Sequence, residues 1–270
     1  MSDNPLDAVR RKKGSSMLIG MRMLKDKKLD ALVSCGNTGA LIASAALSLP
    51  LLTGVSRPAL LVPLPTKKGP VAVLDVGGNV SCKAQHLVQF GFLGAAYQRA
   101  VQGIDVPTVG LLNIGIESKK GTADLRQAFD LLQTHSQKLI ASGSSPRMHF
   151  VGNVEARDVF NGTVNVLVTD GFAGNILLKT AEGVAAFIFD TLKPSVKECE
   201  SVGFQAAFSE VEKQFNYAEY PGAILCGVDG VVVKVHGNAT ADALRISILA
   251  AAQCVQKRVI TLLKQTLNSD

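Results

Sequence analysis

The chain has 270 residues, a formal net charge of +6 and 47% apolar residues, a length that suits one large α/β domain or two small ones. The mildly basic balance favours acidic partners or phosphate, whereas an aromatic content of only 5% and the lack of zinc-finger spacing disfavour nucleic acid. Five scattered cysteines without a C-x-x-C motif indicate reduced thiols in a cytosolic protein, with no metal site.

Apolar runs and helical periodicity alternate along the chain. Strands are predicted over residues 31–34, 58–62, 71–76, 108–113, 149–151, 164–168 and 231–235. Helices are predicted over 17–24, 40–49, 82–101, 122–138, 176–192, 195–216 and 239–267. The strands are runs of Val, Leu and Ala without strict alternation, so both faces of the sheet should be buried. The sequence therefore predicts a doubly wound α/β fold with a mostly parallel sheet and helices on both faces.

The stretch 163–180 combines a strand, a tight glycine turn and a helix. An apolar run reaches Asp170, passes Gly171 and Gly174, and enters a helix at Asn175. Such a turn directs backbone N–H groups and the positive end of a helix dipole at one point, which suits an anion. An ordinary strand-to-helix connection without a ligand is the alternative for a single turn of this kind.

Gly-Asn pairs recur after five of the predicted strands. They are Gly36-Asn37, Gly78-Asn79, Gly152-Asn153, Gly174-Asn175 and Gly237-Asn238. Glycine lets the backbone approach a ligand closely, and asparagine tolerates left-handed dihedrals while offering an amide donor. Ligands of parallel sheets bind outside the carboxyl ends of the strands, so the pairs favour an anion site there, with five unrelated turns as the alternative.

Several motifs together resemble the bacterial phosphate acyltransferase family. They are R-R-K-K-G-S-S-M (10–17), S-C-G-N-T-G-A-L (34–41), V-L-D-V-G-G-N-V (73–80), V-G-L-L-N-I-G (109–115), K-K-G (119–121), V-G-N-V-E-A-R-D (151–158), V-T-D-G-F-A-G-N-I-L-L-K-T (168–180) and V-V-K-V-H-G (232–237). The match runs in order along nearly the whole chain. Family members start with a further strand and an Asp-Ala-Met-Gly-Gly-Asp turn, so we expect the chain, taken as a single α/β domain over 1–270, to be incomplete at its N-terminus.

The resemblance implies transfer of a fatty acyl chain from acyl carrier protein to inorganic phosphate. The product is an acyl phosphate that a downstream glycerol-phosphate acyltransferase uses in phospholipid synthesis. The family fold is similar to phosphotransacetylase and isocitrate dehydrogenase. Its members are cytoplasmic homodimers, associated peripherally with the inner face of the membrane. Neither a cofactor, a metal nor a nucleic acid is implied.

Attack of phosphate on a thioester needs an anion site and stabilisation of the oxyanion, not a covalent intermediate. Lys120 is the candidate catalytic cation, because the family's catalytic lysine falls in K-K-G, and a solvated loop lysine is the alternative. Asn175 is the candidate amide donor to phosphate or oxyanion, with a helix N-cap as its alternative. The candidate substrate-binding residues are Gly36, Asn37, Thr38, Gly39, Gly78, Asn79, Lys83, His86, Gly171, Gly174 and His236.

Two other classes of function stay open. A nicotinamide-dependent dehydrogenase of the related fold is disfavoured, because the sequence contains no G-x-G-x-x-G and no clear cluster of metal-binding aspartates. A non-catalytic scaffold that binds acyl carrier protein or a membrane is the other alternative.

Residues 195–223 are predicted to form a protruding helical hairpin. Pro194 should end the preceding helix. The next helix carries Phe204, Phe208, Val211 and Phe215 on one stripe, which packing within the domain, a dimer mate or lipid would bury. We expect Phe204 and Phe208 to contact the membrane by apolar insertion.

Overall fold

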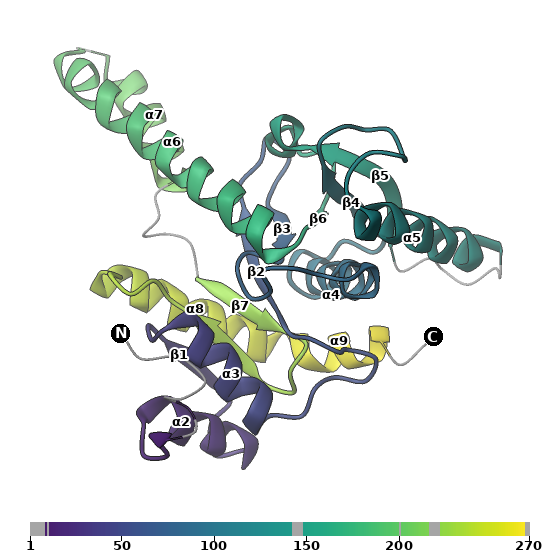
Figure 1. The fold of residues 1–270 in the computed structure, drawn as a ribbon. Helices are drawn as coiled ribbons and strands as arrows, with labels where there is room; N and C mark the ends of the chain where they lie inside the picture. The colour runs from purple at the N-terminus through teal and green to yellow at the C-terminus, as the bar shows by residue number, and fades with distance from the viewer. Residues whose placement is uncertain (1–8, 10, 142–147, 200, 216–221, 268–270) are drawn as a thin grey trace.

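The computed structural model describes residues 9, 11–141, 148–199, 201–215 and 222–267. In this part of the chain, eight strands form one mixed sheet in the order β1-β8-β7-β2-β3-β6-β4-β5 (Figure 1). The strands are β1 (Ala31–Ser34), β2 (Ala59–Leu64), β3 (Val71–Leu74), β4 (Thr108–Asn113), β5 (His149–Glu155), β6 (Val166–Val168), β7 (Ala223–Cys226) and β8 (Val231–Lys234).

The strand direction changes in the middle of the sheet. The four pairings β1–β8, β3–β6, β4–β6 and β4–β5 are parallel, as the apolar runs predict. The three pairings that involve β2 or β7 are antiparallel. As a result, β3, β4, β5 and β6 run in one direction, and β1 and β8 run in the other. Because β7 pairs with Ala59–Leu61 of β2 and β3 pairs with Leu61–Leu64, the carboxyl ends of the two sets meet near Leu61. Two sets of strand ends thus face each other across the β2–β7 centre.

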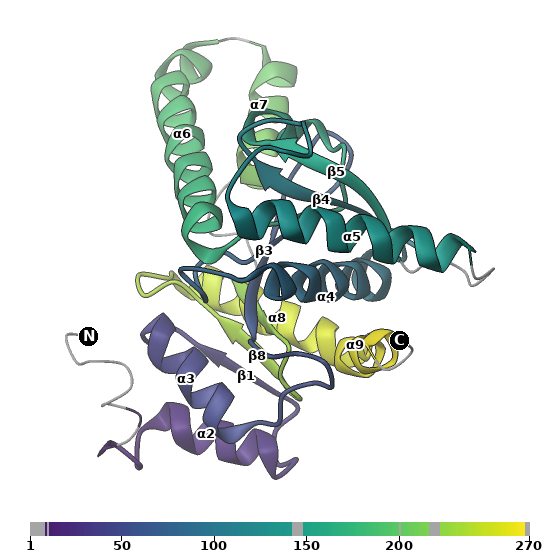
Figure 2. The ribbon, with the colours of Figure 1, turned by 45° about the vertical axis from the view of Figure 1, so that its right-hand side comes forward.

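Helices cover both faces of this sheet, which confirms the predicted fold class (Figure 2). They are α2 (Ser16–Lys25), α3 (Thr38–Ser48), α4 (Ala84–Gln102), α5 (Ala123–Ala141), the 3₁₀ helix η1 (Ala156–Asn161), α6 (Gly171–Glu198), α7 (Val202–Phe215), α8 (Ala241–Gln256) and α9 (Val259–Leu267). Side chains alternate along each strand. In β3, for example, Ala72 and Leu74 face the core under α4, α5, α8 and α9, whereas Val71 and Val73 face the core under α2, α3 and η1.

Most predicted boundaries shift by a few residues, and the largest shifts are at α6, which begins at Gly171 and not at residue 176, and at α7, which begins at Val202 and not at residue 195. Three further differences concern the number or extent of elements. The predicted strand 149–151 continues to Glu155, so Gly152-Asn153 lies inside β5 and not in a turn after it. The short strand β7 was not predicted. The predicted last helix is two helices, because the chain turns at Arg258, whose φ of 51° cannot continue an α-helix.

Pro194 does not end a helix, contrary to the sequence prediction. It lies inside α6, four residues before the end of that helix. Contacts with α7 before and after this position hold the helix together: Lys193 pairs with Glu212 at 2.7 Å, and the Gln205 side chain donates to the Val196 carbonyl at 3.3 Å. The lost N–H is therefore tolerated, and the protruding hairpin consists of α6 and α7 (Figure 1). Residues 200 and 216–221, which belong to the predicted hairpin, lie outside the described residues.

The predicted aromatic stripe of the hairpin faces two ways. Phe208 and Phe215 turn toward Phe189 of α6, with ring centroids 5.5 and 6.2 Å apart. Phe204 instead is 52% exposed. By length and hydropathy alone, α6 is the one helix among the described residues that could cross a membrane, and α8 with α9 passes the same test with a 53° bend. Little of α6 is buried, so its apolar face is open to a partner.

Candidate functional site

A cavity of about 630 Å³ lies where the strand direction changes. Leu60 and Val62 of β2 and Ala223 of β7 contribute to its lining. Its walls come from both halves of the sheet: the loops after β1 and β8 on one side, and the loop after β3 with the start of α6 on the other. Ligands of α/β sheets bind outside the carboxyl ends of the strands, and the residues that follow β1, β3 and β8 all line this cavity.

Three helices begin at this cavity. The side chains of Asn37, Asp170 and Thr240 cap α3, α6 and α8, each accepting a backbone N–H three residues later at 3.1, 2.7 and 3.2 Å. The first turns of α3 and α6, and the loop leading into α8, line the cavity. The positive ends of the three helix dipoles lie at the cavity and together favour an anion there, an effect that the capping carboxylate of Asp170 reduces at α6.

The cavity is also lined by three basic side chains. Lys234 and His236 come from the end of β8, and Lys179 from α6, where it pairs with Glu182 at 2.7 Å. Burial lowers the pKa of Lys234; the nearby Cys35 opposes this shift, and Lys179 adds to it. Burial, then Lys179 and Lys234, lower the pKa of His236, against the opposing effect of Glu182. Burial is the larger cause of both pKa shifts, and repulsion among the three basic groups adds to it; a bound anion would counter that repulsion.

The turn after β3 is built around the buried carboxylate of Asp75. It accepts the backbone N–H groups of Leu60, Gly78 and Asn79 at 2.9, 3.0 and 2.6 Å. Burial raises the pKa of Asp75, and these hydrogen bonds act in the opposite direction. The Asn79 amide donates to Asp75 at 2.8 Å and to the carbonyl of Pro58 at 2.9 Å. Both of its N–H groups are engaged, so Gly78 and Asn79 shape the turn and are not among the cavity-lining residues.

Gly171 and Gly174 allow α6 to start directly against this turn. The Gly171 N–H donates to the carbonyl of Asn79 at 2.7 Å. A Cβ atom on Gly174 would lie 1.9 Å from the carbonyl oxygen of Asp75. Any larger residue would push the helix away from the strand. The close approach brings Asn175 to the cavity wall beside Gly77.

Lys83 and His86 lie outside the cavity lining. His86 is a buried acceptor: its Nδ1 receives the N–H of Lys83 at 3.1 Å and closes a capping box at the start of α4. Burial, then Arg57 and Lys83, lower the pKa of His86, while Asp124 opposes the shift. The pair thus takes the structural role that a helix start favours. Gly39, in the first turn of α3, is also absent from the lining.

Lys120 lies on the exposed loop between β4 and α5, and it is not a cavity-lining residue. Two buried asparagines anchor this loop through hydrogen bonds to its backbone. Asn113 donates to the Lys120 carbonyl at 3.1 Å, and Asn153 donates to the Glu117 carbonyl at 2.8 Å. The Gly152-Asn153 pair therefore supports the loop and not the cavity. The loop stands at the edge where β3 and β6 also end, next to the start of α6.

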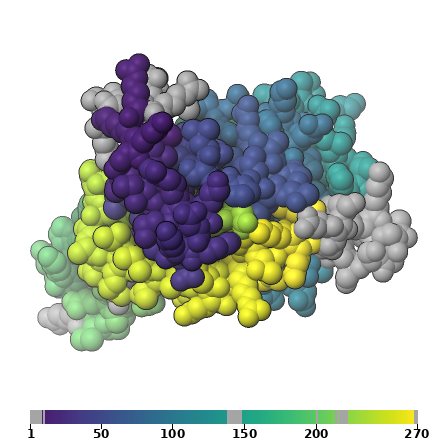
Figure 3. All heavy atoms as spheres, turned by 90° about the horizontal axis from the view of Figure 1, so that it is seen from below, coloured from purple at the N-terminus to yellow at the C-terminus, as the bar shows by residue number. Residues whose placement is uncertain are grey.

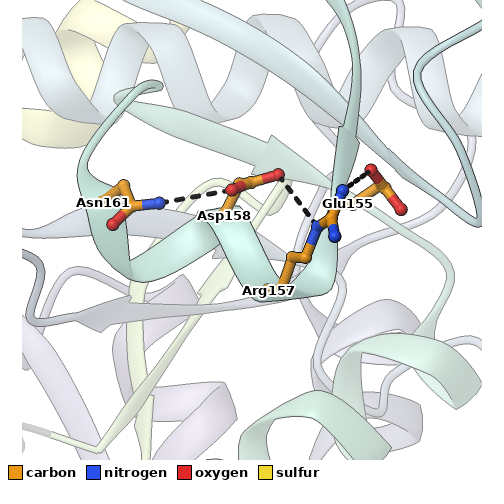
Figure 4. A network of polar contacts seen from close by, with 4 residues as sticks. All are labelled: Glu155, Arg157, Asp158 and Asn161. Atoms are coloured by element: carbon orange, nitrogen blue, oxygen red, sulfur yellow. Dashed lines mark hydrogen bonds and ion pairs between the residues drawn. The ribbon is translucent and has the colours of Figure 1, made fainter.

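The E-A-R-D part of the 151–158 motif forms a surface network (Figure 4). Arg157 pairs with Glu155 at 3.0 Å and approaches Asp158 at 3.7 Å, and Asn161 donates to Asp158 at 3.3 Å. The Arg157 side chain is 78% exposed, so solvent weakens these pairs. None of the four residues lines the cavity.

The cavity thus gathers about half of the predicted site. Gly36, Asn37, Thr38, Gly171, Asn175 and His236 line it. Lys179 and Lys234 were not predicted as site residues, although both lie in the quoted motifs. Lys179 is four residues after Asn175 and so shares its face of the helix, and Lys234 is two residues before His236 on the same side of a strand. Within the described ranges, no group of three or more His, Cys, Asp and Glu side chains is arranged to hold a metal ion.

Comparison with known proteins connects this site to one family. The family described as "Fatty acid synthesis protein" matches residues 1–262. A phosphate acyltransferase from Clostridium tetani is 39% identical over 271 residues, covering 98% of this chain and 78% of that protein. One from Chlamydia pneumoniae is 41% identical over 259 residues, covering 96% of this chain and 74% of that protein.

Solved structures share the fold at low identity. EutD phosphotransacetylase from Staphylococcus aureus superposes with a TM-score of 0.60 at 17% identity, covering 94% of this chain and 74% of that one. A phosphotransacetylase from Streptococcus pyogenes gives a TM-score of 0.59 at 16% identity, covering 93% of this chain and 74% of that one. These two confirm the phosphotransacetylase-like fold, and the closer sequence relatives identify the chemistry. The chain belongs to the phosphate acyltransferase family and is an acyltransferase with phosphate as its acceptor.

Proposed function

We propose that this enzyme transfers a fatty acyl chain from acyl carrier protein to inorganic phosphate. The observation that carries the proposal is the convergence of three helix starts with Lys179, Lys234 and His236 on one cavity. The part of the cavity that these groups line suits a phosphate dianion. Apolar side chains of Phe172, Ile176 and Val80 also line it and offer a surface for the first carbons of an acyl chain.

The reaction needs one displacement. An oxygen of HPO₄²⁻ adds to the thioester carbonyl carbon and forms a C–O bond, and the C–S bond breaks when the resulting tetrahedral intermediate collapses. The carrier's thiolate leaves and takes up the proton that phosphate loses, which gives acyl phosphate and the free thiol. The enzyme's task is to hold phosphate near the carbonyl and to stabilise the negative oxygen of the tetrahedral intermediate.

We assign the two tasks to different groups. Lys234, Lys179 and the helix starts hold phosphate. Asn175, the fifth residue of α6, donates its amide to phosphate or to the oxyanion. Lys120 approaches from the anchored loop after β4 once substrate is bound, because catalytic hydrogen bonds that are long in a free enzyme often tighten only in the complex.

The acyl phosphate is a reactive mixed anhydride, and we propose that a glycerol-phosphate acyltransferase consumes it in phospholipid synthesis. The enzyme would then work as a homodimer at the inner face of the membrane. The exposed apolar face of the α6–α7 hairpin supports surface contact. A membrane span is less suitable for α6, because its start lines the cavity and Lys193 bonds to Glu212 of α7 along its length.

Acyl phosphate formation from acyl-carrier protein and phosphate tests the proposal. The purified chain should form acyl phosphate at the same rate with and without EDTA, since the donors at the cavity are amides and cations and not a carboxylate cluster. A requirement for Mg²⁺ or Mn²⁺ would favour a dehydrogenase of the related fold instead. Carrier binding without turnover would make the chain a scaffold.

Asn175→Ala separates chemistry from partner binding. It should lower turnover while the affinity for acyl carrier protein stays unchanged. Weaker carrier binding with normal turnover would place Asn175 in partner recognition.

A further inference from the structure

The net charge of the chain is concentrated in one segment. Residues 11–28 contain seven cationic side chains and one acidic side chain, which equals the net charge of +6 of the whole chain. The rest of the chain is balanced, with 21 cationic and 21 acidic side chains. All seven cations are exposed, on α2 and the turns at its two ends. We call this surface the α2 ridge: Arg11, Lys12, Lys13, Arg22, Lys25, Lys27 and Lys28.

The first turn of α2 touches the wall of the catalytic cavity. The methyl group of Met17 lies against Gly36, where an added Cβ would be only 2.4 Å from it, and Gly36 lines the cavity. Further along the helix, Gly20 packs closely on Leu32 of β1, with 2.8 Å between an added Cβ and the leucine methyl. The ridge is therefore fixed on the sheet, with its N-terminal end beside the cavity.

The other end of α2 borders a second, smaller cavity of about 270 Å³. Lys27, Arg258 and Lys264 are among its lining residues. Lys27 and Arg258 are the two non-glycine residues with positive φ in the described part of the chain, at helix ends where glycine is usual. Lys264 is paired with Asp229 at 2.7 Å. The basic surface thus continues from the ridge across this hollow to the junction of α8 and α9.

The ridge has the composition of a protein-docking surface. Ile19 and Met23, four residues apart on the exposed face of α2, are 45% and 37% exposed between the cations. The acidic groups facing this surface are Asp26 and Asp30 beside the ridge and Asp229 at the second cavity. Apolar contacts ringed by charges of one sign fit a partner with an acidic face around an apolar spot.

The ridge and the hairpin point in different directions. The α6–α7 hairpin projects from one end of the molecule, and α2 lies at the other in both ribbon views (Figures 1 and 2). Seen from below, α2 forms a raised strip across the surface beside α8 and α9 (Figure 3). A membrane that meets the hairpin leaves the ridge facing away from it. The ridge is then available to a soluble acidic partner.

We propose that the α2 ridge is the docking surface for the acidic carrier protein that delivers the acyl thioester. This rests on the proposed transfer from acyl carrier protein. The acidic face of the carrier lies along α2, and its thioester arm enters the cavity past Met17. The cations steer the carrier to the enzyme, and the apolar pair Ile19 and Met23 contributes the contact at the centre.

Charge reversal at either end of the ridge tests the proposal. Binding of fluorescent holo-acyl carrier protein, which has no acyl group to transfer, is measured for Lys25→Glu/Lys28→Glu and for Lys12→Glu/Lys13→Glu. The matched control, Arg99→Glu/Lys197→Glu, makes the same change in net charge at exposed residues elsewhere. Each ridge variant should raise the Kd by roughly 10-fold or more and flatten its salt dependence. The control should stay within about 2-fold.

Kinetics separate docking from chemistry. The ridge variants should raise KM for the acyl-carrier protein while kcat and KM for phosphate stay unchanged. Ridge variants that bind the carrier as well as the control does would overturn the proposal. Loss of binding to phosphatidylglycerol vesicles with unchanged carrier binding would also overturn it, and would assign the ridge to lipid. If the wild-type chain forms no acyl phosphate but the ridge variants still lose carrier binding, the docking surface stands and the proposed transfer fails.

Discussion

Gly174 of α6 and Asp75 of the β3 turn are in backbone contact, so close that a Cβ atom on Gly174 would stand 1.9 Å from the Asp75 carbonyl oxygen. This contact fixes the start of α6 against the sheet, and it determines where Asn175 and Lys179 meet the cavity. The position of the anion site thus depends on the absence of a side chain.

Gly174→Ala should therefore destabilise the protein strongly. Neither the β3 backbone nor Thr169, whose methyl would be 2.7 Å away, can yield without moving the buried Asp75 turn. We expect a loss of about 3 kcal/mol or more in the free energy of unfolding, measured by urea denaturation. Gly183→Ala in the same helix is the matched control, since nothing lies within 4 Å of its added Cβ. It should stabilise the protein by up to about 1 kcal/mol. Equal effects of the two substitutions would show that the contact is not tight.

Much of the fold follows from local sequence, and the centre of the sheet does not. The predicted strands 31–34 and 108–113 match β1 and β4 to the residue, because each is an apolar run between turn residues. The strand β7 has only four residues, which is too short to show a helical or an alternating pattern. Its antiparallel pairing with β2 and β8 is what defines it. Pro194 indicates a helix end from local rules, but packing of α6 on α7 overrides it.

The residues of the candidate site also divide into those that local sequence predicts and those that long-range topology determines. Asn37 caps a helix start, which local sequence reveals, whereas Asn175 was predicted to open a helix that begins at Gly171, with Asp170 as its cap. Lys234 becomes a site residue only because β8 ends opposite α6 across the antiparallel centre of the sheet. That juxtaposition is a long-range property of the topology. Conversely, Lys83 and His86 cap their own helix, and local pattern does not distinguish such a cap from a ligand contact.

Lys120→Ala and Lys234→Ala should affect different kinetic constants. Lys234 lines the cavity, so its loss should raise KM for phosphate with a smaller change in kcat. Lys120 lies outside the cavity lining in the free enzyme and is proposed to stabilise developing charge, so Lys120→Ala should lower kcat by roughly 10²-fold or more with folding intact. Steady-state rates at saturating and subsaturating phosphate distinguish the two. If Lys120→Ala keeps the wild-type rate at saturating phosphate, its catalytic role is wrong.

Protonation of His86 should weaken the fold below neutral pH. Its pKa is lowered in the folded state, while the unfolded chain has the ordinary value of about 6.5. The unfolded state therefore binds more protons as the pH falls below about 6.5, and stability present above that pH is progressively lost. His86→Gln keeps an acceptor but cannot titrate. Urea denaturation across this range should give a shallower pH dependence for the variant than for the wild type. Identical slopes would mean that burial and the neighbouring charges of Arg57 and Lys83 do not lower the pKa of His86 in the folded protein.

The exposed face of the hairpin should hold the protein at the membrane by apolar insertion. Phe208 packs inward on Phe189, so the test uses Phe204 with Phe187 of α6, which is 71% exposed. Charge at these two positions cannot enter the acyl boundary of the bilayer, whereas the packing between the helices is untouched. In a liposome flotation assay, Phe187→Glu/Phe204→Glu should leave the vesicles and stay dimeric by light scattering. Binding of the wild type should depend only weakly on salt.

The control adds the same charge to the same hairpin at polar positions. Ser195 of α6 and Ser209 of α7 are exposed, so Ser195→Glu/Ser209→Glu should still float. If the phenylalanine variant instead becomes monomeric, its apolar face is the contact between two copies of the chain and the membrane role is wrong. If it floats as the wild type does, α6 and α7 do not provide the lipid contact. Flotation lost in both variants alike would indicate that added negative charge, and not loss of apolar surface, releases the protein.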